Sequence, residues 1–131
     1  MRYLIVPEIF VIYAEIAKVS SIERRDVQSI GGLESALAQP QQTFDGTDLY
    51  QTVEAKAAAL LYSLCQNHPF ADGNKRVAFL AARIFLRLNG LDIHVETSEA
   101  RGLMYSVAKG EIPTDKIAAW IGQRVHPYRS D

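Results

Sequence analysis

The sequence predicts an all-α fold with one small β-hairpin, and three observations lead to this prediction. Apolar residues recur with a helical period over most of the chain. One segment, residues 43–49, instead places Asp45-Gly46 between β-prone neighbours, which is typical of a hairpin turn. The 131 residues, 48% of them hydrophobic and 22% charged, have the composition of a globular protein. We therefore expect a compact helical bundle in which residues 1–131 form a single domain.

The first third of the chain predicts two helices joined by a polar loop. The first is expected at Pro7–Val19, because proline suits a first turn and four apolar residues follow at helical spacing: Ile9, Ile12, Tyr13 and Ile16. Residues 20–32 are polar, end in two glycines, and predict a loop with a helical turn near residues 24–28. A short helix, Leu33–Ala38, should end before Pro40.

The middle of the chain predicts two long helices. The first is expected at Asp48–Asn67, with Asp48 as its N-cap and Gln51 three residues on. The second, Lys75–Asn89, is apolar around most of its circumference and therefore predicts the buried central helix. Its polar strip consists of three arginines: Arg76, Arg83 and Arg87.

The last third predicts two shorter helices after a brief extended segment. Gly90 ends the central helix, and residues 92–95 are expected to be extended. Helices follow at Ser98–Lys109 and Thr114–Val125, the second closed by Pro127. The Asp45-Gly46 hairpin is thus the one clear β signal in the sequence.

Charge and composition exclude several kinds of partner. The formal net charge is −1, so the chain lacks the global positive field that drives direct nucleic-acid binding. No apolar run is long enough to span a bilayer, and no membrane partner is expected. The single cysteine, Cys65, cannot form an internal disulfide, which fits a reducing compartment. We therefore expect a cytoplasmic protein.

The segment His68–Arg76 joins the two long helices and carries a mixture of polar residues that a core does not need. Pro69 should push His68 toward extended dihedrals and end the preceding helix at Asn67 or His68. Gly73 permits a tight backbone, and Asn74 is a favoured N-cap for the next helix. Free amides at a helix N-terminus bind anions, and Lys75 with Arg76 adds two cations there.

Each polar residue of this segment has a functional and a structural interpretation. His68 is either a general base or a structural helix cap. Asp72 is either a ligand of magnesium beside a phosphate or the first residue of an Asx-turn. Asn74 is a phosphate donor, a helix cap or both, and Arg76 could simply belong to the arginine strip. Phe70 is expected to be an apolar anchor of the loop under either interpretation.

The nine residues His68–Arg76 resemble the signature of the Fic/Doc family, H-x-F-x-(D/E)-(G/A)-N-(G/K)-R. Lys75 stands where adenylylating Fic enzymes carry glycine, so the chain resembles the death-on-curing (Doc) toxins of type II toxin–antitoxin systems. The resemblance extends to Gly31–Leu37, to Phe85–Gly90 and to Gly110-Glu111-Ile112. It implies a Fic/Doc-like helical bundle.

The resemblance also assigns roles within the site. His68 would be the base that activates a target hydroxyl, and Asp72 would hold Mg²⁺. The phosphates of ATP, the co-substrate, would be held by four consecutive residues: Gly73, Asn74, Lys75 and Arg76. The hairpin would be the flap that aligns a target segment by strand pairing, through Phe44, Asp45, Gly46 and Thr47.

Three functions remain open on these grounds. Lys75 implies a kinase that transfers the γ-phosphate to a Ser or Thr hydroxyl of a protein, with a translation elongation factor as the leading target and inhibition of translation as the result. Pro69 and Gly73 follow the adenylylating form of the signature, so AMP transfer to a protein hydroxyl is the alternative. A further alternative is a non-catalytic all-α interaction module.

The resemblance further implies a cognate antitoxin. Self-inhibited Fic proteins carry (S/T)-x-x-x-E-(G/N), and no Ser or Thr of this sequence has Glu four residues later. We therefore expect inhibition by a small partner that folds as a helix into a groove beside the His68 loop. Phe10, Tyr13 and the hairpin are the expected surface of that groove.

Overall fold

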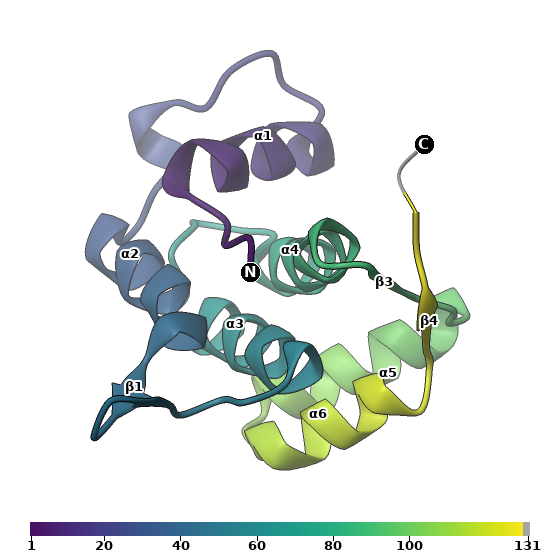
Figure 1. Ribbon diagram of the computed structural model, residues 1–131. Helices are drawn as coiled ribbons and strands as arrows, with labels where there is room; N and C mark the ends of the chain where they lie inside the picture. The colour runs from purple at the N-terminus through teal and green to yellow at the C-terminus, as the bar shows by residue number, and fades with distance from the viewer. Residues whose placement is uncertain (130–131) are drawn as a thin grey trace.

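A computed structural model describes residues 1–129 and shows a mostly helical, compact fold (Figure 1). The helices are α1 (Val6–Ala17), α2 (Ile30–Ala38), α3 (Val53–Asn67), α4 (Asn74–Leu88), α5 (Thr97–Ala108) and α6 (Thr114–Gly122), with 3₁₀ turns η1 (Arg24–Asp26) and η2 (Gln39–Gln41). The strands are β1 (Thr43–Phe44), β2 (Thr47–Asp48), β3 (Leu91–Ile93) and β4 (Val125–Pro127). The all-α prediction is confirmed.

Helices α3 and α4 form the centre of the molecule. They share the most extensive contact in the fold, with α1 on one side of the pair and α5 and α6 on the other (Figure 1). The buried residues of α4 lie on one continuous face at spacings of three and four, among them Val77, Ala81 and Phe85, whereas Leu88 at the end of the helix is exposed. One continuous apolar core contains side chains from all six helices. Within residues 1–129, every helix is too short or too polar to cross a membrane.

Helix α2 begins three residues earlier than predicted. Gly31 and Gly32 lie in its first turn rather than in a loop, because the hydroxyl of Ser29 caps the helix by accepting from the Gly32 amide at 2.9 Å. A Cβ on Gly32 would lie 3.2 Å from the carbonyl oxygen of Asn67. The glycine therefore allows α2 to pack closely against the end of α3.

Helix α3 begins later than predicted, and Asp48 is not its N-cap. Thr52 caps the helix instead, since its hydroxyl accepts from the amide of Ala55 at 3.0 Å. Asp48 is the last residue of β2, and its carboxylate lies 3.0 Å from the ammonium of Lys56. Asp48, which the sequence predicted as a helix cap, therefore belongs to the hairpin and links it to α3 through Lys56.

The predicted hairpin is present. Strands β1 and β2 are antiparallel, and the turn residues Asp45 and Gly46 have φ angles of 55° and 81°. Two successive positive φ angles are what a two-residue type I′ turn requires. The hairpin projects from the molecule (Figure 1), and 76% of the surface of Phe44 is exposed.

The prediction of a single hairpin is incomplete, because β3 and β4 form a second antiparallel pair. The expected last helix, Thr114–Val125, ends at Gly122, and Val125 lies opposite Ile93 in the new sheet. The paired residues are far apart in the sequence, and each strand is only three residues long. Neither strand therefore carries the alternating pattern by which a strand is predicted.

Asp92 attaches β3 to the central helix. Its buried carboxylate accepts hydrogen bonds from the guanidinium groups of Arg83 at 3.0 Å and Arg87 at 2.9 Å, and from the Ile93 amide at 2.8 Å. Burial by itself would raise the pKa of Asp92, but these hydrogen bonds outweigh burial and hold the pKa well below its ordinary range. Two of the three arginines in the predicted strip thus have a structural role.

We expect Asp92→Asn to lower the free energy of unfolding by about 2 kcal/mol at pH 7, because it leaves two partly buried arginines without a counter-charge. The wild-type carboxylate has a lowered pKa in the folded state, so its contribution is fully present above the pKa of the unfolded chain and is lost as the pH falls through the folded value. Urea unfolding of both proteins at pH 7 and near pH 3 tests this. A difference in stability that does not shrink in acid would contradict the ionic interpretation.

Candidate active site

The loop from His68 to Gly73 connects α3 to α4. Helix α3 ends at Asn67, as predicted, but His68 is in the left-handed region, with φ 51° and ψ 54°, rather than extended. Pro69 disfavours the right-handed helical region at the residue before it. The left-handed conformation of His68 also avoids that region, and a residue in this conformation ends an α-helix.

Backbone pairing with the segment after η1 holds this loop in place. The carbonyl oxygen of Pro69 accepts from the amides of Gln28 at 2.8 Å and Ser29 at 3.0 Å, and the Ala71 amide donates to the Asp26 carbonyl at 2.9 Å. Val27 and Phe70 form an isolated antiparallel bridge. Residues that the sequence indicated only as a polar loop therefore shape the site.

Phe70 has no exposed surface, which is the placement that an apolar anchor requires. Its ring stacks on Tyr13 at a centroid distance of 4.5 Å and meets the edge of Phe10 at 6.5 Å. Tyr13 is itself buried, and its hydroxyl donates to the Asp26 carboxylate at 3.0 Å. The prediction that Tyr13 lines a surface groove is therefore wrong, because Tyr13 supports the loop from below.

Asn74 is the first residue of α4, and Gly73, with φ 81°, occupies the N-cap position that was predicted for Asn74. The Asn74 side chain is buried and folds back onto Phe70. Its oxygen Oδ1 accepts from the Phe70 amide at 3.0 Å, and its nitrogen Nδ2 donates to the Phe70 carbonyl at 2.8 Å. These two bonds close the loop and fix which end of the amide carries the oxygen.

The same amide nitrogen lies 3.1 Å from Nδ1 of His68. An amide nitrogen can only donate, so Nδ1 of His68 is the accepting nitrogen of this contact. In the neutral ring the proton then lies on Nε2. Asn74 therefore orients both the loop backbone and the imidazole.

Asp72 is exposed at the outer edge of the loop. Its Oδ1 accepts from the Gly73 amide at 2.8 Å, so the carboxylate orders the turn and keeps Oδ2 available for a ligand.

Burial raises the pKa of the Tyr13 hydroxyl beneath the loop, assisted by the hydrogen bond to Asp26 and the charges of Asp26 and Asp72. Among residues 1–129, no three His, Cys, Asp or Glu side chains gather as a protein-only metal cage.

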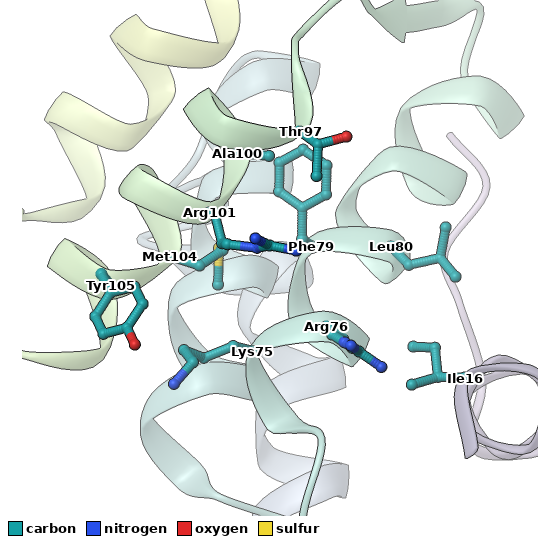
Figure 2. Close-up of a pocket in the computed structure, with 10 residues that line it drawn as sticks. All are labelled: Ile16, Lys75, Arg76, Phe79, Leu80, Thr97, Ala100, Arg101, Met104 and Tyr105. Atoms are coloured by element: carbon teal, nitrogen blue, oxygen red, sulfur yellow. The ribbon is translucent and has the colours of Figure 1, made fainter.

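Lys75 and Arg76 are exposed in the first turn of α4 and line a groove of about 470 Å³ (Figure 2). The Lys75 ammonium lies 5.0 Å from the centre of the Tyr105 ring on α5, within the range of a cation–π interaction. Apolar side chains also line the groove, among them Ile16, Phe79, Leu80 and Met104. Unlike Arg83 and Arg87, Arg76 forms no ion pair within the described chain.

The comparison with known families adds to this geometry. The model of the family described as the Fic/DOC family matches residues 3–86, which include the hairpin, the loop and the first turns of α4. The chain belongs to the Fic/Doc family. The match extends well beyond the loop, so it does not rest on the short signature alone.

Two relatives of this Fic/Doc protein carry Doc names. It is 44% identical over 95 residues to Toxin Doc of Mycolicibacterium smegmatis, an alignment that covers 71% of this chain and 73% of the relative. It is 35% identical over 72 residues to Protein kinase doc of Escherichia phage P1, covering 55% of this chain and 53% of that relative.

The fold of this Fic/Doc chain thus gathers His68, Asp72, Asn74, Lys75 and Arg76 in one loop and the helix turn that follows. No hydrogen bond or ion pair within residues 1–129 joins the hairpin to that loop. The hairpin is bonded to α3 through Asp48 and Lys56.

Sequence reasoning missed three residues. Asp26 accepts from the Ala71 amide of the loop, Tyr105 lies against Lys75, and Lys56 bonds to Asp48 of the hairpin. Their neighbouring residues carry no signal that would have identified them.

Proposed function

We propose that this Fic/Doc protein is a Doc-type toxin that transfers the γ-phosphate of ATP to a Ser or Thr hydroxyl of a cytoplasmic protein. The observation that carries the proposal is the ammonium of Lys75 in the first turn of α4, beside the loop of His68. The similarity to a phage protein named as a kinase supports the same reaction. By resemblance, a translation elongation factor is the proposed target, and inhibition of translation is the consequence.

His68 is the proposed general base. Its exposed position at the end of α3 leaves it accessible to a target hydroxyl. The bond from Asn74 to Nδ1 favours the tautomer with the ring proton on Nε2. To accept a proton at Nε2, the ring must first adopt the other tautomer, with its proton on Nδ1. In that tautomer the Nδ1–H and the Asn74 amide are two donors facing each other, so their hydrogen bond is lost and the ring must turn away from Asn74 to act as a base. A hydroxyl donating to Nε2 favours this tautomer.

The phosphates of ATP are proposed to bind at the start of α4. The first amides of an α-helix have no partner within the helix and favour an anion, and Lys75 and Arg76 add two positive charges without an ion-pair partner in the described chain. The Gly73 backbone allows close approach. Asn74 is proposed to contribute through the loop geometry that it fixes, since its side chain already bonds to Phe70.

Asp72 fits a magnesium ligand. Mg²⁺ in nucleotide sites is held by one or two carboxylates together with phosphate oxygens, and Asp72 presents one exposed carboxylate beside the proposed phosphate site. The ion would neutralise phosphate charge when bound. The chain's own part is to hold that carboxylate in place through the hydrogen bond from Gly73.

The hairpin is the proposed flap for the target. All four of its central residues, Phe44, Asp45, Gly46 and Thr47, are exposed. A two-stranded sheet keeps unpaired backbone groups at its outer edges, so an extended target segment can add to it as a further strand. Such pairing would present a target hydroxyl in a fixed register.

A cognate antitoxin is the proposed inhibitor, and the groove beside Lys75 and Arg76 is its proposed binding site in place of the surface around Phe10 and Tyr13. The apolar groove between α4 and α5 lies beside the loop and carries the positive charges of Lys75, Arg76 and Arg101 on its walls (Figure 2). An amphipathic helix with an acidic flank would fit it better than the surface around Phe10 and Tyr13. Co-expression of the antitoxin should restore growth.

Lys75→Gly converts the signature to its adenylylating form and separates the kinase from the AMP-transfer alternative. We expect this variant to lose transfer from γ-labelled ATP by roughly a hundredfold, the loss typical of removing one preorganised charge from a transition state. The measurement compares labelling of bacterial cytosolic protein with γ-labelled and α-labelled ATP.

The matched control for this change is Lys116→Gly, which removes an exposed lysine from the first turn of α6. Lys116→Gly makes the same lysine-to-glycine change in the first turn of a helix, but far from the His68 loop, so it should leave the labelling of protein unchanged. If the wild-type protein transfers label from α-labelled ATP, it is an adenylyltransferase and the kinase proposal is wrong.

We expect Asp72→Asn to weaken ATP binding in the presence of Mg²⁺ by about tenfold or more, and binding without metal by much less. Asparagine can still accept from the Gly73 amide, so the turn should persist. Calorimetric titration of ATP with and without Mg²⁺ measures both effects, with Asp115→Asn in the first turn of α6 as the control. Equal losses under the two conditions would assign Asp72 to loop structure.

A further inference from the structure

Lys56 is a buried cation that the proposed reaction does not use. It lies in the first turn of α3, and its side chain is 3% exposed. Its ammonium donates to the Pro40 carbonyl at 3.1 Å and to the Asp48 carboxylate at 3.0 Å. The ring of Tyr3 lies 5.8 Å away. The ammonium therefore has two hydrogen-bond acceptors and an aromatic ring beside it.

A charge in this position needs those partners. Burial alone lowers the pKa of Lys56, but the hydrogen bond and charge of Asp48, together with the Tyr3 hydroxyl, outweigh burial and raise the pKa above its ordinary value. Lys56 is therefore charged at neutral pH. An apolar side chain would fill the same space without desolvating a charge, so filling space does not account for a lysine here.

The two partners of Lys56 stand on either side of the hairpin. Pro40 belongs to η2, which enters β1, and Asp48 is the last residue of β2. The hairpin ladder itself is closed by the Leu49 amide, which donates to the Gln42 carbonyl at 2.9 Å. Within residues 1–129, the bond between Lys56 and Asp48 is the one side-chain hydrogen bond that joins this hairpin to a helix.

Helix α3 connects this attachment to the proposed active site. Lys56 lies at its start and His68 immediately after its end. Twelve residues of α-helix span about 18 Å and behave as a rigid rod on this scale. A hairpin held by Lys56 is therefore held at a fixed position relative to His68, even though the hairpin and the loop do not bond directly.

We propose that Lys56, through Asp48, is a positioning residue that sets the register of the target-binding hairpin relative to His68. The inference rests on the proposed function, in which this hairpin aligns the protein target. It predicts that loss of the Lys56–Asp48 bond impairs use of the protein target and leaves use of ATP unaffected. A purely structural role would instead lower stability and affect both substrates together.

The test measures phosphate transfer from γ-labelled ATP to a purified bacterial translation elongation factor. Asp48→Ala is expected to raise the KM for the factor roughly tenfold, the effect of losing one charge-assisted hydrogen bond. The kcat and the KM for ATP should stay close to wild type. Asp48→Asn keeps an accepting oxygen without the charge and should fall between wild type and Asp48→Ala.

Glu99→Gln is the matched control, since Glu99 is similarly exposed and forms an ion pair of similar length with Arg124, far from the hairpin. Hydrogen exchange supplies a readout that needs no target. Exchange of the hairpin amides, residues 43–49, should accelerate in Asp48→Ala and in Lys56→Met but not in Glu99→Gln. Asp48 is half exposed, so Asp48→Ala should fold even where Lys56→Met does not.

Unchanged hairpin exchange in Asp48→Ala, or faster exchange with an unchanged KM for the factor, overturns the proposal. A wild-type protein that does not label the factor contradicts the proposed target instead. In that case the growth arrest caused by each variant tests whether the Lys56–Asp48 bond positions the hairpin. At equal protein levels, Asp48→Ala should arrest growth less effectively than Glu99→Gln, and equal arrest overturns the inference.

Discussion

His68→Ala is expected to abolish growth arrest and to lower the rate of phosphoryl transfer by roughly a hundredfold to ten-thousandfold, the usual contribution of a positioned base. The side chain is exposed, and within residues 1–129 its one hydrogen bond is with Asn74, which keeps both of its bonds to Phe70. The variant should therefore fold with nearly wild-type stability. Parallel measurements of label transfer, growth and thermal melting test this.

His94→Ala is the control for this experiment, because His94 is also an exposed histidine and follows β3 on another part of the molecule. It should arrest growth as the wild type does. A folded His68→Ala protein that still arrests growth would remove His68 from the reaction. A variant that melts far below the wild type would instead show that the imidazole stabilises the loop.

Phe70→Ala is expected to lower the free energy of unfolding by about 3–5 kcal/mol, the range for truncating a fully buried phenylalanine. The ring fills the space between Tyr13 and Phe10, and its removal leaves a cavity directly under the loop. The surviving folded protein should lose activity as well, because the loop geometry depends on this anchor. Urea unfolding measures the first effect.

Phe44→Ala provides the opposite case with the same chemical change. Phe44 is 76% exposed on the hairpin, so its truncation should alter stability by less than about 0.5 kcal/mol. If Phe44 contacts the target, the variant should nevertheless lose activity. Similar losses of stability in the two variants would contradict the assignment of Phe70 as the buried anchor.

The parts of the fold that were predicted correctly are those specified by neighbouring residues. The helical repeat of α4 and the Asp45-Gly46 turn are local patterns, and both are present. The β3–β4 pair was missed because it depends on contacts between distant segments. The start of α2 was misplaced because glycine usually ends a helix, whereas Gly31 and Gly32 lie in the first turn of a helix that the Ser29 hydroxyl caps.

The candidate site shows the same division. Its nine residues from His68 to Arg76 were identifiable because they are consecutive and chemically unusual. The Asp26 carbonyl, which holds the loop through the Ala71 amide, was not identifiable, because Asp26 comes from another segment and lies in no distinctive sequence. The same is true of Lys56, which attaches the hairpin. Tyr13 was misassigned for a related reason: its helical spacing indicates a buried face but not which loop covers it.

The left-handed conformation of His68 implies a compromise between stability and activity. That conformation strains most residues with a side chain, and glycine or asparagine is the usual occupant of such a helix end. Selection for a stable fold alone would favour glycine there. If His68 is the proposed base, the helix terminus is less stable than glycine would make it, and this cost places an imidazole where α3 turns toward α4.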